Sequence, residues 1–432
     1  MGINFDDVCQ LEKTTIKKGD RWIYVADFNI KHEGNKLKST DRIDVEIKDL
    51  KQLTNQGAKT AILAHKGRFK DKDNEDLDFI VPCLSEKLGT KVKYFSENNT
   101  ENAVNFVKEL KPGQVAIMGN TRFHEGEEKN NPELAEQFAE LSDFVAVGGF
   151  GKAHREHASN VGILEHLPGY AARNQLKEMM LLAPWAGKDE EKYSVAVLGG
   201  IKKEKIITGL EGFTKIYDAV IPGGIVMNTI LKVLGYKVGD SIISDGGKSF
   251  EGNVEEILKE YDFDRKSKIL HPKENSERRA EIYLPETVII ADKEWNSEIA
   301  GNKKWNSKTR YISDNSHFPA GYPTVDFELS YAMKSSLNRL VKEGGRIIIA
   351  GTPSIYTEGF KFSTGSILNI MESNKEIKGI VLGGDTAAEL EYEPFSTGGG
   401  SALYFVVNGT TPVFEALKAN KKREEKKAAK HS

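Results

Sequence analysis

Short, almost unbroken apolar runs recur along the chain, and they constrain its fold more than any other feature. They are rich in valine, isoleucine and alanine, and include RWIYVADFNI, AKTAILAH, GQVAIMG, DFVAVGG, YSVAVLGG, YDAVIPGG, ETVIIAD, GGRIIIAGT and IKGIVLGGDT. Runs without polar alternation are typical of strands buried on both faces. Amphipathic stretches such as VEIKDLKQLTNQG separate them. Strands that alternate with helices predict an α/β fold built on parallel sheets.

The number of these runs is too large for one ordinary domain, and 432 residues are enough for two. We therefore expect two doubly wound, Rossmann-like lobes joined by a hinge helix. The expected boundaries are residues 1–172 for the N-terminal lobe, 173–192 for the hinge helix and linker, and 193–405 for the C-terminal lobe. Residues 406–417 should return to the first lobe. Residues 293–330 lack regular patterning and are expected to form an extended loop or insertion.

Residues 418–432 form a charged tail. Lysine and arginine dominate the sequence KANKKREEKKAAKHS, which predicts a solvated helical or disordered segment. A weak electrostatic contact with an anionic partner is the alternative.

Composition narrows the functional classes. The net charge of −3 is small for this length, so it does not favour nucleic-acid binding. Cys9 and Cys83 do not form a metal-type or redox-type pair, which favours a reducing, cytoplasmic location. The N-terminus lacks the apolar core of a signal peptide, and no run of about 18 apolar residues predicts a membrane span.

Cationic residues follow the apolar runs in the first half of the chain. The run AILA is followed by HKGR, the run AIMGN by RFH, and the run FVAVGG by FGKAHREH. Open parallel sheets bind ligands beyond the carboxyl ends of their strands. Each cation alone is adequately explained as a surface residue, but several such strand ends at one edge predict a site for a small, multiply charged anion.

Glycines follow the apolar runs in the second half, in GGIKKEK, PGGIVMN, AGTPS and GGDTAAEL. Glycine lets the backbone approach a ligand closely, and helix N-termini attract phosphates. These strand ends therefore predict a nucleotide site. Asp385 opens a helix in this half, either as a plain N-cap or as a contact to Mg²⁺.

Two other patterns resemble functional motifs but are poor matches. GGKS at 246–249 resembles the end of a phosphate-binding loop, yet Ile242 stands where that motif needs glycine. His154 and His157 resemble a metal pair, but no third ligand is near in sequence and Arg155 would repel a cation.

Taken together, these segments resemble the phosphoglycerate kinase family. ADFNI resembles its first-strand signature, DRIDVEIKDL the segment with its substrate arginine, and AHKGR its Ser-His-Leu-Gly-Arg motif. GNTRFHEGEEKN is similar to its Asn-Leu-Arg-Phe-His segment, and FGKAHREH to its Phe-Gly-Thr-Ala-His-Arg-Ala-His motif. AVLGGIKKEKI, GYKVGDSI, GGDTAAEL and FSTGGGSAL follow in the family's order.

The resemblance implies a reversible phosphoryl transfer between 1,3-bisphosphoglycerate and ADP, in glycolysis and gluconeogenesis, by a monomer with no nucleic-acid or membrane partner. It implies that the N-terminal lobe binds 3-phosphoglycerate, that the C-terminal lobe binds ATP or ADP with Mg²⁺, and that a hinge brings them together. The substrate positions match Asp27, Asn29, Arg42, His65, Arg68, Arg122, Arg155 and His157. The nucleotide positions match Gly199, Gly200, Lys202, Glu358, Gly383, Gly384 and Thr386. Arg42, Lys202 and Lys205 match catalytic positions, and Asp385 matches the metal contact.

The sequence departs from the family at several points. Val25 replaces an arginine, Val147-Gly148-Gly149 replaces Asn-Asp-Ala, and the Trp-Asn-Gly-Pro nucleotide loop becomes IAGTPS. The family's Leu-Asp-Ile-Gly-Pro segment is not recognisable. Two alternatives therefore stay open beside an active phosphoglycerate kinase. One is a catalytically weak relative kept for binding or regulation, and the other is a kinase for a different acceptor.

Overall fold

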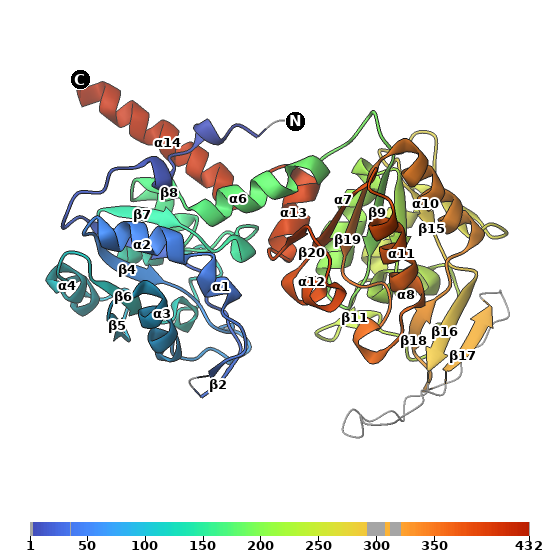
Figure 1. Ribbon diagram of the computed structural model, residues 1–432, viewed down its shortest axis with the longest axis horizontal. Coiled ribbons are helices and arrows are strands. Elements are labelled where there is room, and N and C mark those ends of the chain that lie inside the picture. The colour runs from blue at the N-terminus through green and yellow to red at the C-terminus, as the bar shows by residue number, and fades with distance from the viewer. Residues whose placement is uncertain (1–2, 35, 292–306, 312–320, 432) are drawn as a thin grey trace. The chain divides into compact units, whose positions relative to one another are not determined.

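The computed structural model describes residues 3–34, 36–291, 307–311 and 321–431. The chain forms two compact units, one of Gly2–Ala183 with Thr410–Ser432 and one of Pro184–Gly409. Each unit contains a parallel sheet with helices packed against it (Figure 1). Within the described residues, no helix is both long and apolar enough to cross a membrane.

The N-terminal unit is built on a six-stranded parallel sheet with strand order β5-β6-β4-β1-β7-β8. Its strands are β1 (Arg21–Val25), β4 (Lys59–Leu63), β5 (Val92–Phe95), β6 (Val115–Met118), β7 (Phe144–Val147) and β8 (Gly169–Ala171). Its helices are α1 (Asp41–Asp44), α2 (Ile47–Asn55), α3 (Val81–Leu88), α4 (Glu101–Glu109), α5 (Pro132–Ala139), α6 (Arg173–Leu182) and α14 (Pro412–His431). A short hairpin pairs β2 (His32–Glu33) with β3 (Lys36–Leu37). The central strand β1 is buried from Trp22 to Val25, as its unalternated apolar sequence predicts.

The C-terminal unit is built on an eight-stranded sheet with strand order β13-β14-β15-β10-β9-β19-β20-β21. Its parallel strands are β9 (Ser194–Leu198), β10 (Ala219–Pro222), β15 (Glu281–Tyr283), β19 (Arg346–Ala350), β20 (Lys378–Leu382) and β21 (Phe395–Ser396). Two antiparallel strands, β13 (Tyr261–Asp264) and β14 (Ile269–Pro272), extend one edge. The helices are α7 (Glu211–Ile216), α8 (Gly224–Val233), α9 (Glu251–Leu258), α10 (Tyr331–Glu343), α11 (Phe362–Ser373), α12 (Gly384–Leu390) and α13 (Gly400–Asn408), and the π-helical turn η8 (Lys205–Leu210) precedes α7.

The run ETVIIAD does not join this parallel sheet, which corrects the sequence interpretation. It forms β16 (Thr287–Ala291), which pairs antiparallel with β17 (Ser307–Tyr311) and β18 (Thr324–Phe327). These three strands form a separate sheet of order β17-β16-β18, so burial of the run alone did not indicate which sheet it joins. Within 293–330, which we expected to be loop, Ser307–Tyr311 and Thr324–Phe327 are thus strands, residues 321–323 and 328–330 lie outside helices and strands, and the remaining residues lie outside the described part of the chain.

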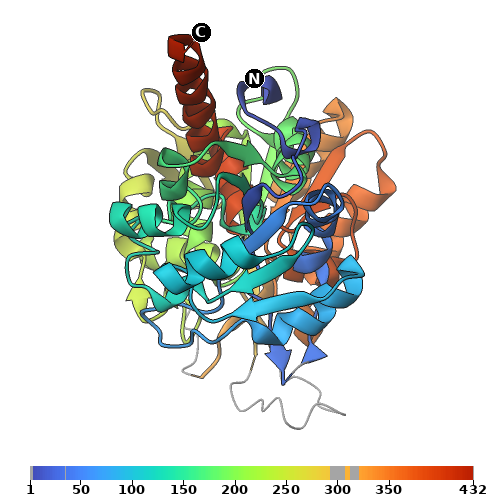
Figure 2. The ribbon, with the colours of Figure 1, turned by 90° about the vertical axis from the view of Figure 1, so that its left-hand side faces the viewer.

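The charged tail also differs from the solvated segment expected from residue 418. Helix α14 runs on to His431 and lies beside β8 (Figure 1), and Figure 2 shows its C-terminal end pointing away from the rest of its unit. Asn420 is buried and donates to the carbonyl oxygens of Leu164 and Leu167, at 2.6 and 2.7 Å, while accepting from the Gly169 amide at 2.8 Å. The charged sequence gave no sign that the Asn420 side chain is buried. Only the last turns of α14 are exposed as expected.

Candidate functional site

The cationic segments of the N-terminal unit lie at one edge of its sheet. Strands β6, β4, β1 and β7 are neighbours and run parallel, so their carboxyl ends share that edge. Asp27 follows β1 and His65 follows β4. Arg122 belongs to the 3₁₀ turn after β6, and Lys152 to the 3₁₀ turn after β7. Parallel topology therefore gathers residues that are far apart in sequence.

Asp27 is the centre of this group. Its buried carboxylate accepts from Arg42 Nη1 at 2.6 Å, and His65 Nε2 lies 3.9 Å from its other oxygen. A Cβ at Gly151 would lie 2.5 Å from Asp27 Oδ2, so glycine is needed there for the loop after β7 to approach the carboxylate. Arg42 itself is about half exposed, which leaves its guanidinium within reach of a ligand.

The remaining predicted acceptor residues differ in their burial and in their interaction partners. Arg122 is buried and pairs with Glu128 at 2.6 Å, whereas Arg68 is exposed and pairs with Asp71 at 3.5 Å. Arg155 Nε donates to His154 Nε2 at 3.2 Å. The exposed side chain of Asn29 accepts from the Gly67 amide at 3.3 Å, which ties the end of β1 to the loop after β4.

The strand-end pattern suggested that His65 and His157 are cations, but the structure does not support this. Burial comes first among the causes that lower the pKa of His65 well below its usual range, followed by the charges of Lys152 and Arg122. Burial, then Arg122 and Lys152, lowers the pKa of His157 to about 2. Both imidazoles are therefore neutral near pH 7 and offer hydrogen bonds to a ligand, while the positive charge comes from arginine and lysine.

Sequence reasoning noticed Lys152 as a strand-end cation but did not include it among the site residues. The structure buries Lys152 amid this group, and its charge influences both histidines. Glu127 is also buried beside the site, where its carboxylate accepts from Ser159 Oγ at 2.6 Å and from the Ser159 amide at 3.0 Å. The acidic run HEGEEKN gave no sign of which glutamate turns inward.

Glu46 explains one departure from the family. A Cβ at Gly148 would lie 2.6 Å from Glu46 Oε2, so the buried Glu46 carboxyl occupies the space that a side chain at 148 would need. The other oxygen accepts from the Gly149 amide at 2.9 Å and from Asn174 Nδ2 at 2.6 Å, and Tyr24 contacts the same carboxyl. Glycine at 148 and glutamate at 46 are thus fitted to each other.

The glycine-rich loops of the C-terminal unit follow β9, β10, β19 and β20, which are neighbours and parallel. Glycine is suited to these loops for two different reasons. A Cβ at Gly199 would lie 2.1 Å from Thr352 O, so glycine there lets two loops cross. Gly200 and Gly384 instead have nothing closer than 4.0 Å, and Gly383 has only Thr386 Oγ1, at 3.7 Å. These three positions leave space where a side chain would stand, although the Gly200 amide already donates to Thr352 O at 2.9 Å and the Gly383 amide to Ser396 O at 2.8 Å.

The charged nucleotide-side candidates lie near these loops in sequence. Lys202 is exposed after β9, and Lys205 begins the π-helical turn η8, where burial, followed by the charge of Lys202, lowers its pKa to about 8. Glu358 belongs to the 3₁₀ turn Tyr356–Glu358 after β19. Asp385 is exposed in the first turn of α12, but Gly383 is the N-cap residue and no side chain caps this helix. The plain N-cap role considered for Asp385 is therefore wrong.

The structure also shows the surroundings of the two segments that matched functional motifs poorly. The GGKS segment turns between β11 (Ser244–Asp245) and β12 (Lys248–Ser249), a two-stranded antiparallel hairpin. No group of three or more histidine, cysteine, aspartate or glutamate side chains suited to a metal ion occurs in the described part of the chain. A bound Mg²⁺ would therefore have to take most of its ligands from the nucleotide phosphates and water.

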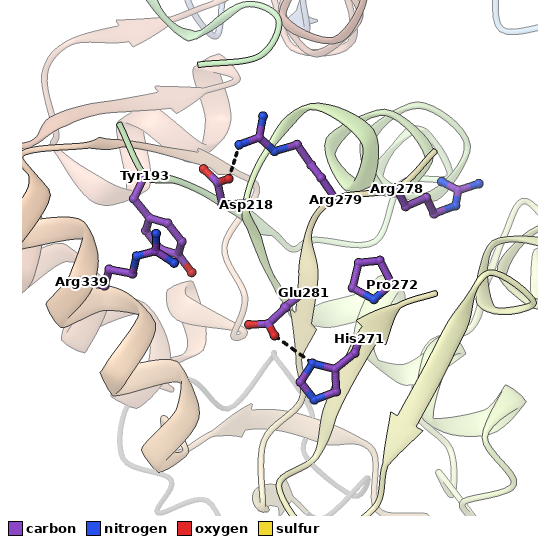
Figure 3. Close-up of a pocket in the computed structure, with 8 residues that line it drawn as sticks. All are labelled: Tyr193, Asp218, His271, Pro272, Arg278, Arg279, Glu281 and Arg339. Atoms are coloured by element: carbon purple, nitrogen blue, oxygen red, sulfur yellow. Dashed lines mark hydrogen bonds and ion pairs between the residues drawn. The ribbon is translucent and has the colours of Figure 1, made fainter. Parts of the chain in front are cut away.

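A polar hollow of about 440 Å³ in the C-terminal unit is not part of this site (Figure 3). Tyr193, Asp218 and Glu281 place it at the amino ends of β9, β10 and β15, opposite the glycine-rich edge. Its basic side chains already have partners: Arg279 bonds to Asp218, and His271 lies 2.8 Å from Glu281. Arg339 lies over the Tyr193 ring.

Two parallel-sheet units define a class of two-lobed α/β proteins that bind anionic ligands at strand ends. One carries cations and the other open glycine loops at its carboxyl edge. The sequence model of the family described as phosphoglycerate kinase matches residues 13–409. This chain belongs to the phosphoglycerate kinase family.

Individual relatives agree along their whole length. The phosphoglycerate kinase of Thermosipho africanus is 32% identical, with 96% of this chain and 100% of that protein covered. That of Dictyoglomus turgidum is 28% identical, with 91% and 94% covered. The solved phosphoglycerate kinase of Coxiella burnetii has a TM-score of 0.69 at 25% identity, covering 96% of this chain and all of that one. The Pyrococcus horikoshii enzyme, at 22% identity and a TM-score of 0.70, supports the fold.

Proposed function

We propose that this protein works as a phosphoglycerate kinase, moving a phosphoryl group reversibly between 1,3-bisphosphoglycerate and ADP to give 3-phosphoglycerate and ATP. The observation that supports this best is the half-exposed Arg42 guanidinium held on buried Asp27, at a sheet edge lined with further cations, in a chain that belongs to this family. The reaction serves glycolysis and gluconeogenesis. Because one chain holds both sets of candidate residues, we propose that it acts as a monomer, in the cytoplasm.

The acceptor side is assigned to the N-terminal unit. Arginine donates two hydrogen bonds at once to a carboxylate or phosphate, which suits Arg68, Arg122 and Arg155 to the anionic ends of 3-phosphoglycerate. The carboxylate of Asp27 and the neutral ring of His65 suit the acceptor's hydroxyl group. Arg42 is the proposed contact to the transferred phosphoryl group, because it matches the family's catalytic arginine and its half-exposed guanidinium is held on buried Asp27.

The nucleotide side is assigned to the C-terminal unit. Gly200, Gly383 and Gly384 have no side chain to keep the phosphates away, and Thr386 and Glu358 are proposed as further contacts. Asp385 suits Mg²⁺, because its carboxylate is exposed beside open backbone and is not used as a helix cap. When bound with the nucleotide, Mg²⁺ would neutralise phosphate charge.

The chain's own contribution to catalysis is position and charge. Phosphoryl transfer proceeds with negative charge spread over the moving oxygens, so cations on both sides lower the barrier. Arg42 would supply this charge from the acceptor side, and Lys202 with Lys205 from the nucleotide side. No covalent enzyme intermediate is needed. Water would compete as an acceptor, so we propose that hinge closure about residues 173–192 excludes it.

Separate titrations of 3-phosphoglycerate and Mg-ADP by calorimetry test this division of labour. Arg68→Ala should weaken binding of 3-phosphoglycerate and leave Mg-ADP binding unchanged, whereas Asp385→Asn should do the reverse. Both residues are exposed, so neither change should alter the fold. If wild-type protein binds neither ligand, or if each variant weakens both ligands equally, the proposal fails.

A further inference from the structure

Lys152 is a buried cation without a matched counterion. It ends the 3₁₀ turn Phe150–Lys152, its side chain is 3% exposed, and its Nζ has no hydrogen-bond partner among the residues that the structure describes. A buried ammonium normally pairs with a carboxylate or accepts a large loss of stability. Lysine at this position also departs from the family, because the family motif that FGKAHREH resembles has threonine there.

The carboxylates whose charges act most strongly on Lys152 already have other partners or are mostly protonated. Glu127, Asp27 and Glu46 all favour its charged form, while burial and Arg122 oppose it and leave the pKa of Lys152 lowered. Asp27 is paired with Arg42 at 2.6 Å, and Glu127 accepts from Ser159. The pKa of Glu46 is raised to about 8, chiefly by burial, so that group is mostly uncharged near pH 7.

The local backbone fixes Lys152 at the acceptor edge. Gly149 begins the turn with a φ of 65°, and a Cβ there would lie 2.8 Å from the Asp27 amide nitrogen. Gly151, inside the turn, also lies against the Asp27 carboxylate. Both Gly149 and Gly151 are therefore packed closely against Asp27. Lysine has a flexible four-carbon stem, which lets Nζ move toward an anion once one is present.

We infer that Lys152 is an additional cation of the acceptor site, whose missing counterion is an anionic oxygen of the bound acceptor, carboxylate or phosphate. The inference rests on the proposed function, since it assumes that 3-phosphoglycerate binds at this edge. It assigns Lys152 a role in affinity and in selection for highly charged acceptors. Its stability cost in the free protein is offset only when the acceptor is bound.

Lys152→Met tests this assignment, because methionine keeps most of the stem and removes the charge. Loss of a buried charge contact should weaken 3-phosphoglycerate binding at least about 10-fold in calorimetry. The free variant should be at least as thermally stable as wild type, because the uncompensated charge is gone. Lys66→Met is the matched control: its ammonium is at the same edge but is already paired with Glu75 at 3.3 Å. It should bind 3-phosphoglycerate within about twofold of wild type.

Proton uptake gives a second readout that a purely structural lysine would not change. An acceptor anion raises the lowered pKa of Lys152, so wild-type protein should take up protons on binding 3-phosphoglycerate at alkaline pH. Calorimetry in buffers of different ionisation enthalpy measures this uptake, and it should shrink in Lys152→Met and persist in Lys66→Met.

The outcomes separate the two hypotheses. If wild type does not bind 3-phosphoglycerate, the proposed function fails before the inference is reached. If wild type binds and Lys152→Met binds within twofold, the inference is wrong. A less stable Lys152→Met with unchanged affinity would make Lys152 a structural counterion of Glu127. If both stability and affinity fall, Lys152→Thr decides: weak binding at restored stability supports the inference, and restored binding overturns it.

Discussion

Replacing Glu46 by glutamine should remove a pH-dependent weakness of the N-terminal unit. Burial is the largest cause that raises the pKa of Glu46 to about 8, and nearby Asp49 and Asp27 raise it further. Bonds from Tyr24 and the Gly149 amide oppose the rise but do not cancel it. The folded protein therefore holds a proton on Glu46 that the unfolded chain releases near its ordinary pKa of about 4.5.

The sign and size follow from this difference. Because the native state binds more protons between about pH 4.5 and 8, the free energy of unfolding falls as the pH rises through that window. Each pH unit costs about 1.4 kcal/mol, so the 3.5 units between pH 4.5 and pH 8 give a penalty of at most about 5 kcal/mol, reached above pH 8. Glutamine mimics the protonated acid: its oxygen can accept from the Gly149 amide and Asn174, and its amide can donate to Tyr24.

Urea unfolding of wild type and Glu46→Gln at pH 5.5, 7 and 8.5 measures the effect. The variant should be about 1.4 kcal/mol more stable than wild type at pH 5.5, one unit above the ordinary pKa, and this advantage should grow as the pH rises. Glu109→Gln, on an exposed position of α4, is the matched control and should follow wild type. A constant difference between Glu46→Gln and wild type at all three pH values would refute the reasoning.

Three further variants test other parts of the structure. Asn420→Ala should cost about 2–3 kcal/mol of stability through lost buried hydrogen bonds, while exposed Lys426→Ala should cost nothing; equal melting temperatures would contradict the docking of α14. Asp385→Asn should weaken Mg-ADP binding without lowering the melting temperature, because Gly383 is the helix N-cap; unchanged affinity would remove Asp385 from the site. Gly199→Ala should destabilise the fold through its clash with Thr352, whereas Gly384→Ala should fold normally and bind Mg-ADP less tightly. Folding defects in both, or in neither, would show that the two glycines do not differ as argued.

The parallel sheets were predictable because a strand covered on both faces has a distinctive sequence. Trp22–Val25 and Ser194–Leu198 are buried throughout, and their apolar runs indicated this directly. Strand β5 gave no such signal, because it is a half-buried edge strand. The antiparallel pairing of β16 was missed for a different reason: an apolar run shows burial, but its direction depends on the strands that follow.

The site shows a similar limit. Motifs singled out Asp27, Arg42 and His65, and the structure brings these three together. Which groups would be charged could not be predicted, because that depends on burial and on neighbours distant in sequence. The neutral histidines, the raised pKa of Glu46 and the unmatched Lys152 arise from packing between the loops after β1, β4 and β7. A single sequence does not display such packing.

Turnover in a coupled assay with 3-phosphoglycerate and Mg-ATP, comparing wild type with Arg42→Ala, tests the central claim most directly. The account predicts phosphoryl transfer by wild type and a loss of about 10³-fold or more in the variant, since removing an arginine that stabilises the transferred group has effects of that size. Because Arg42→Ala leaves the buried Asp27 carboxylate without this partner, the melting temperature of the variant is measured in parallel and turnover is compared where both proteins are folded. No measurable transfer by folded wild-type protein, or near-wild-type turnover by folded Arg42→Ala, would contradict it.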